Sequence, residues 1–86
     1  MCKLKGLRKE PSYEQDAIRL GLSVRRFDEM TRGIEITLAE YADKYPFVPH
    51  TDIQLIKTEV EGYILTAYYI NEPDVVRLLR LKIDRI

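Results

Sequence analysis

The chain has 86 residues, with 14 lysines and arginines against 14 aspartates and glutamates, so its formal net charge at pH 7 is zero. This length predicts one domain over residues 1–86, and the neutral balance argues against a dedicated nucleic-acid binder, which is usually more basic. No apolar run approaches the roughly 18 residues that cross a bilayer, so no membrane segment is expected. The single cysteine, Cys2, cannot form an internal disulfide, and a cytoplasmic protein is therefore expected.

Positive charge is concentrated at the two ends of the chain. Residues 1–10 and residues 75–86 each hold four basic side chains against one acidic side chain. The basic side chains are Lys3, Lys5, Arg8 and Lys9 in the first segment and Arg77, Arg80, Lys82 and Arg85 in the second. If the two ends meet in one sheet, they form a basic strip that can contact phosphates; otherwise they are solvated surface charges.

A short first strand over residues 3–8 is followed by a segment with the spacing of two helices. Ser12 is the expected N-cap of the first helix, in a capping-box pattern with Gln15, and Gly21 ends that helix. Ser23 is the expected cap of a second, longer helix. The apolar stripes are Tyr13, Ala17 and Leu20 in the first helix, and Val24, Phe27, Thr31, Ile34, Leu38 and Tyr41 in the second. The short break between the helices predicts a helical hairpin.

Three β-rich runs fill the second half of the chain, at residues 53–57, 63–70 and 75–83. The breaks between them contain Gly, Asn, Asp and Pro, which predicts an antiparallel meander. In the last run the apolar parity changes between Leu78 and Leu79, which indicates either a β-bulge or burial of both faces. Together with the first strand, these runs predict an α+β fold in which a helical hairpin packs on a small antiparallel sheet, in the order β-α-α-β-β-β.

The residue types that usually carry chemistry are sparse. His50 is the only histidine and lies beside a proline in the connector before the sheet. No second His or Cys offers a ligand set, so neither a metal site nor a cofactor is expected. Tyr68 and Tyr69 are neighbours in a strand, so they point to opposite faces, and one of them is expected in the core.

Several short segments, spread over residues 8–84, carry a resemblance to a known family. They are SYEQD at 12–16, RRFDE at 25–29, GIE at 33–35, LA at 38–39, YPFVP at 45–49, LIKT at 55–58, YYIN at 68–71 and VVRLL at 75–79. Together with the order of the elements, these segments resemble the RelE/ParE superfamily of bacterial toxins from type II toxin–antitoxin systems. The resemblance implies the fold β-α-α-β-β-β and a toxin function.

The resemblance implies inhibition of translation by a ribosome-dependent mRNA endonuclease that needs no metal. The alternative is a non-enzymatic toxin or interaction module, such as a DNA gyrase inhibitor or a degenerate family member. RNA-cutting members use basic side chains on the open face of the sheet. The implied catalytic residues are Arg80, Lys57 and Tyr69. The implied nucleic-acid-binding residues are Arg77, Lys82, Arg85, Lys3 and Lys5. The implied partners are a cognate antitoxin and either the ribosome with its mRNA or DNA gyrase.

Two positions of the middle strand depart from the family pattern. Members often have an arginine early in this strand and another near its end, where this chain has Leu65 and Tyr69. These departures leave the nuclease and the non-enzymatic toxin open as alternatives.

Overall fold

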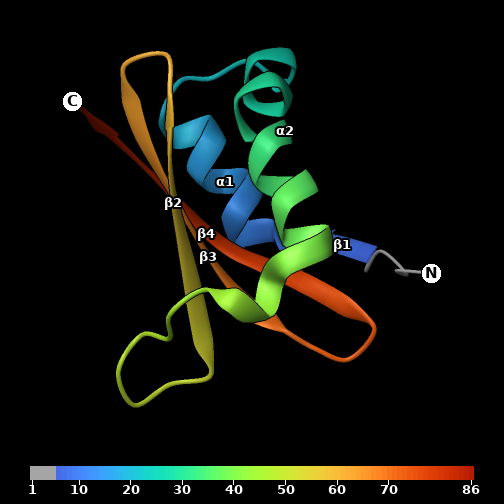
Figure 1. The fold of residues 1–86 in the computed structure, drawn as a ribbon. Coiled ribbons are helices and arrows are strands. Elements are labelled where there is room, and N and C mark those ends of the chain that lie inside the picture. The colour runs from blue at the N-terminus through green and yellow to red at the C-terminus, as the bar shows by residue number, and fades with distance from the viewer. Residues whose placement is uncertain (1–5) are drawn as a thin grey trace.

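A computed structural model describes residues 6–86 as a four-stranded sheet with two helices on one of its faces (Figure 1). The strands are β1 (Gly6–Lys9), β2 (Ile53–Val60), β3 (Tyr63–Asn71) and β4 (Val75–Arg85). The helices are α1 (Pro11–Arg19), α2 (Val24–Tyr41) and the short 3-10 helix η1 (Ala42–Lys44). The predicted α+β class and helical hairpin are confirmed. Within the described residues, no helix is long and apolar enough to span a membrane.

The sheet is mixed, so the prediction of an all-antiparallel sheet is wrong for one strand pair. β2, β3 and β4 form the predicted antiparallel meander, but β1 pairs with β4 in parallel, in the sheet order β1-β4-β3-β2. After β1, α1 and α2 form a hairpin that leads the chain back along the sheet (Figure 1). β2 therefore starts at the same end of the sheet as β1 and runs in the same direction. β3 then runs back, so β4 is parallel to both β1 and β2.

The helix ends follow local signals at two of three predicted positions. Ser12 is not the N-cap of α1, because Glu10 takes that position and the Ser12 hydroxyl donates to the carbonyl of Leu79. Gly21 follows α1 with a φ of 76°, a left-handed conformation that glycine adopts without strain. Ser23 caps α2 as predicted, since its hydroxyl accepts a hydrogen bond from the Arg26 N–H at 3.1 Å.

We expect the Ser23 cap to contribute measurably to stability. Replacement Ser23→Ala removes the acceptor for the Arg26 N–H and should lower the free energy of unfolding by about 1 kcal/mol in urea titrations. Ser23→Asp supplies another acceptor at the same position and should retain most of the stability. An equal loss in both variants would show that the hydroxyl is not acting as a cap.

The core lies between the helices and the sheet face that they cover. Its apolar members are Tyr13, Ala17, Phe27, Met30, Ile34, Leu38 and Ala42 from the helical half, and Ile56, Leu65, Ala67, Tyr69, Val76, Leu78 and Leu81 from the strands. Leu20, Val24 and Tyr41 belong to the predicted stripes but are exposed. Each lies at or just beyond the end of a helix, where fewer elements can cover a side chain.

A β-bulge in β4 explains the change of apolar parity. Tyr68 is opposite Arg80 and Tyr69 is opposite Leu78, so Leu79 has no partner on β3. The extra residue reverses the facing of the residues after it. Leu78 before the bulge and Leu81 after it are both buried on the helix side, and Arg80 consequently belongs to the other, open face.

Candidate nucleic-acid interface

One row across the open face of the sheet carries two lysines. Lys57 on β2 is opposite Thr66 on β3, which is itself opposite Lys82 on β4. Residues that are directly opposite in a sheet share a face, so the two lysines flank Thr66 on the open side. Thr66 is only 3% exposed although both helices pack on the other face, so neighbouring side chains on this face cover it. Lys57 and Lys82 are exposed and able to reach a ligand, although Asp84 Oδ2 lies 3.7 Å from Lys82 Nζ and competes for this lysine.

The next row carries Leu55, Tyr68 and Arg80 and leads into a groove. The groove has a volume of about 490 Å³ and lies beside β4, between the end of α1 and Val48 of the connector. Its charged lining consists of three cations, Arg19, Arg80 and Lys82, and one carboxylate, Asp16. The surplus of cations suits a phosphate group, while Tyr68 and the apolar lining suit a base or sugar.

Asp16 fixes the position of Arg80. The carboxylate of Asp16 accepts hydrogen bonds from Arg80 Nε at 2.9 Å, from Arg80 Nη2 at 3.0 Å and from the Leu81 N–H at 2.8 Å. Burial alone would raise the pKa of Asp16, but these hydrogen bonds outweigh it and hold the pKa below its usual 3.8. Asp16 is 4% exposed, whereas the Arg80 side chain is 54% exposed. Asp16 on α1 therefore holds the guanidinium at the groove, while about half of the Arg80 side chain stays exposed to a ligand.

The spacing of polar residues on α1 explains this arrangement. β1 ends at Lys9, opposite Leu78, and α1 then continues along the same edge of β4. The Ser12 hydroxyl donates to the Leu79 carbonyl, and Asp16 accepts from the Leu81 N–H, so the helix satisfies main-chain groups that β1 does not reach. Ser12, Asp16 and Arg19 are spaced as one helical face. Sequence reasoning missed this polar face, although a carboxylate between the apolar positions Tyr13 and Ala17 was a usable signal.

We expect the Asp16–Arg80 link to make stability depend on acid pH. A carboxyl whose pKa is lower in the folded chain stabilises the fold above its unfolded pKa, and this contribution is lost as the pH falls through the folded pKa. Urea unfolding between about pH 5 and about pH 2 should therefore show a loss of stability that is shallower in Asp16→Asn. An equally steep loss in both proteins would contradict the assignment to Asp16.

Tyr69, which the resemblance placed in the catalytic set, does not lie on the open face. Its side chain is 0% exposed on the helix side, and its hydroxyl donates to the carbonyl of Ala42. Burial raises its pKa, so the hydroxyl keeps its proton. A substrate on the open face cannot reach this group, which removes Tyr69 from the candidate site. The tyrosine on the open face is its neighbour Tyr68.

The predicted basic strip is divided. The two ends of the chain do meet, because Arg8 on β1 is opposite Arg77 on β4. However, Glu10 lies between them, 2.9 Å from Arg77 Nε and 3.7 Å from Arg8 Nε, and Glu72 is 3.3 Å from Arg77 Nη1. The carboxylates therefore compete with any phosphate for these arginines.

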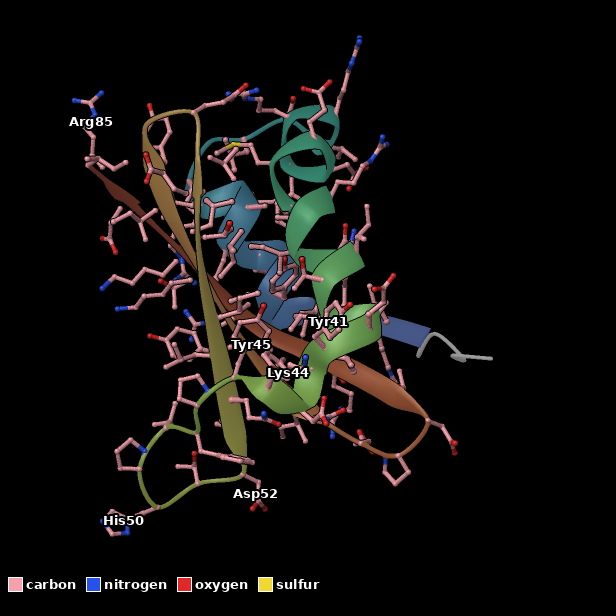
Figure 2. The ribbon with its side chains drawn as sticks, viewed as in Figure 1. Tyr41, Lys44, Tyr45, His50, Asp52 and Arg85 are labelled. Atoms are coloured by element: carbon pink, nitrogen blue, oxygen red, sulfur yellow. The ribbon has the colours of Figure 1, made fainter. Side chains whose placement is uncertain are left out.

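The remaining predicted binding residues lie elsewhere. Arg85 lies at the far end of β4, at the opposite end of the molecule from the connector that carries His50 and Asp52 (Figure 2). Lys3 and Lys5 lie outside the described residues. An acidic row, Glu59–Ile64–Asp84, borders the lysine row. The compact basic site therefore consists of Lys57, Lys82, Arg80 and Arg19.

No model of a known protein family matches the sequence, and no curated protein or solved structure matches it. Across residues 6–86, no group of three or more His, Cys, Asp and Glu side chains is placed to hold a metal ion. The assignment of a function therefore depends on the open face of the sheet.

Proposed function

We propose that the chain is the toxin of a type II toxin–antitoxin pair, and that it inhibits translation by cutting mRNA at the ribosome in the cytoplasm. The observation that carries the proposal is the Lys57–Thr66–Lys82 row beside the Arg80 groove. This arrangement puts three cations from two strands on one face, as the resemblance to the RelE/ParE superfamily implies. A cognate antitoxin is the proposed partner that keeps this face inactive.

The side chains of the site suit metal-independent cleavage of RNA. Lys57 and Lys82 are exposed point charges that hold backbone phosphates. Arg80, oriented by Asp16, stabilises the negative charge that builds up on the scissile phosphate. In this reaction the ribose 2′-oxygen loses its proton and attacks phosphorus, and the 5′-oxygen leaves with a proton, giving a cyclic phosphate and a 5′-hydroxyl. Tyr68 is the hydroxyl-bearing side chain of the groove that can take part in proton transfer.

One observation favours a non-enzymatic toxin as the second candidate. Tyr69 is in the core, and Arg80 already uses its Nε and one terminal nitrogen on Asp16. The same face would then bind its target, such as DNA gyrase, and block it without chemistry. The two candidates differ in whether RNA is broken.

Expression from a tightly repressed promoter distinguishes the candidates. The proposal expects growth arrest, together with breaks in abundant messages that primer extension places in phase with codons. Arrest with intact messages and altered plasmid supercoiling would establish the gyrase candidate instead. Normal growth at full expression of folded protein would overturn both toxin functions.

A further inference from the structure

Part of the outer edge of β2 has no covering element. β2 is the last strand of the sheet (Figure 1), and the connector pairs with the beginning of this strand through Phe47 and Gln54. The Val48 N–H donates to the Ile53 carbonyl at 2.7 Å, and the Leu55 N–H donates to the Pro46 carbonyl at 3.1 Å. Within residues 6–86, no strand or bridge pairs with this edge beyond Leu55. Residues 56–60 therefore present an open strand edge.

The direction of the main-chain groups on this edge follows from the connector bonds. Ile53 and Leu55 use their outward-facing carbonyl and N–H for the connector. In an antiparallel strand the N–H and C=O of one residue point to the same side, and successive residues alternate. Lys57 and Glu59 therefore direct both of their main-chain groups outward, whereas Thr58 directs its groups to β3.

We infer that this edge pairs with the same edge of a second copy of the chain, as an antiparallel strand pair centred on Thr58. In this register Thr58 is opposite its own counterpart, and Lys57 is opposite Glu59 of the second copy on both sides of the two-fold axis. The outward main-chain groups of Lys57 and Glu59 then bond each other in the hydrogen-bonded pair of the ladder. Each chain thus contributes one half of two opposite-charge pairs.

Charge and parity together select this register. Centring the pair on Lys57 or on Glu59 would put like charges directly opposite each other, which destabilises a strand pair. Centring the pair between two residues would put Lys57 or Glu59, whose main-chain groups point outward, opposite a residue such as Thr58. The main-chain groups of Thr58 already bond to β3, so no hydrogen bond could form there. Lysines and glutamates also protect free edges from pairing. Here, however, one lysine, Lys57, and one glutamate, Glu59, lie on the same face on either side of Thr58. An antiparallel pair centred on Thr58 therefore puts opposite charges next to each other.

The pairing would extend both faces of the sheet. On the helix side, Ile56, a core residue, would be opposite the second copy's Val60, which is partly buried against the core. The open faces of the two copies would form one continuous surface. Because only residues 56–60 take part, the contact is small and the dimer should be weak and dependent on concentration. The inference does not depend on the proposed toxin activity, and in the pair Glu59 of the second copy would compete with a phosphate for Lys57.

Charge reversal tests the pairing in solution. Sedimentation of the full chain over a range of concentrations should show a shift from the mass of one chain toward twice that mass. Lys57→Glu and Glu59→Lys should each weaken association by about tenfold or more, and the double exchange should restore it. Arg25→Glu, a reversal on the exposed surface of α2, should leave association unchanged. A wild-type chain that stays monomeric, or a double exchange no better than the single variants, would overturn the inference.

Cysteine cross-linking tests the register. In a Cys2→Ala background, Thr58→Cys should form an intermolecular disulfide, because the centred residues have Cα atoms only about 4.5 Å apart. Lys57→Cys and Glu59→Cys should cross-link far less, since each is offset from its own counterpart by about 7 Å or more. Equal cross-linking at all three positions would contradict a pairing centred on Thr58.

Discussion

Replacing Lys57 and Lys82 together by alanine is expected to weaken binding of single-stranded RNA by about tenfold or more. The two side chains belong to one row of the open face and flank the buried Thr66. If each lysine neutralises one phosphate, the slope of log affinity against log salt should fall in magnitude by about 1.4 in the double variant. Fluorescence anisotropy with a labelled oligonucleotide at several salt concentrations measures both quantities.

The control for this prediction removes the same charge from another surface. Arg25 and Arg32 are exposed on α2, which packs on the opposite face of the sheet. Arg25→Ala/Arg32→Ala should change RNA affinity and the salt slope far less than the lysine double variant. Equal effects of the two double variants would mean that RNA responds only to net charge and that the open face is not the interface.

Replacing Asp16 by alanine is expected to lower the free energy of unfolding by about 3 kcal/mol. The substitution leaves the buried Leu81 N–H without its acceptor and frees the Arg80 guanidinium. It also breaks a link between α1 and the bulged strand β4, because Asp16 and Leu81 are 65 residues apart in the chain. Urea denaturation followed by circular dichroism measures the loss.

Two further variants separate the contributions of Asp16. Asp16→Asn keeps an oxygen that can accept from the Leu81 N–H but loses the charge opposite Arg80, so its loss of stability should be clearly smaller. Glu14→Ala removes an exposed carboxylate from the same helix and should change stability by less than about 0.5 kcal/mol. If Asp16→Ala were as mild as Glu14→Ala, the link between α1 and β4 would not be structural.

Features that depend on neighbouring residues could be predicted from the sequence. Gly21 and Ser23 marked the helical hairpin, because a left-handed residue and a capping hydroxyl act within one turn. The change of parity between Leu78 and Leu79 marked the bulge, because side chains alternate strictly along a strand.

Features set by distant contacts could not be predicted in the same way. Residues 6–9 carry no local signal that β1 pairs with β4, because this pairing depends on the path by which the helical hairpin returns the chain to the sheet. β3 is apolar on both faces, so alternation separated Tyr68 from Tyr69 without stating which is buried. Tyr69 is the core residue because its row contains Gln54 and Leu78, both covered by the helices.

The measurement that tests the central claim most directly is an NMR titration of the labelled protein with a short single-stranded RNA at low salt. The account predicts that amide shifts concentrate on the open face, at Lys57, Thr66, Tyr68, Arg80 and Lys82, and weaken as salt is added. Shifts confined to the outer surfaces of α1 and α2, or no shifts at low salt, would contradict RNA binding on the open face of the sheet.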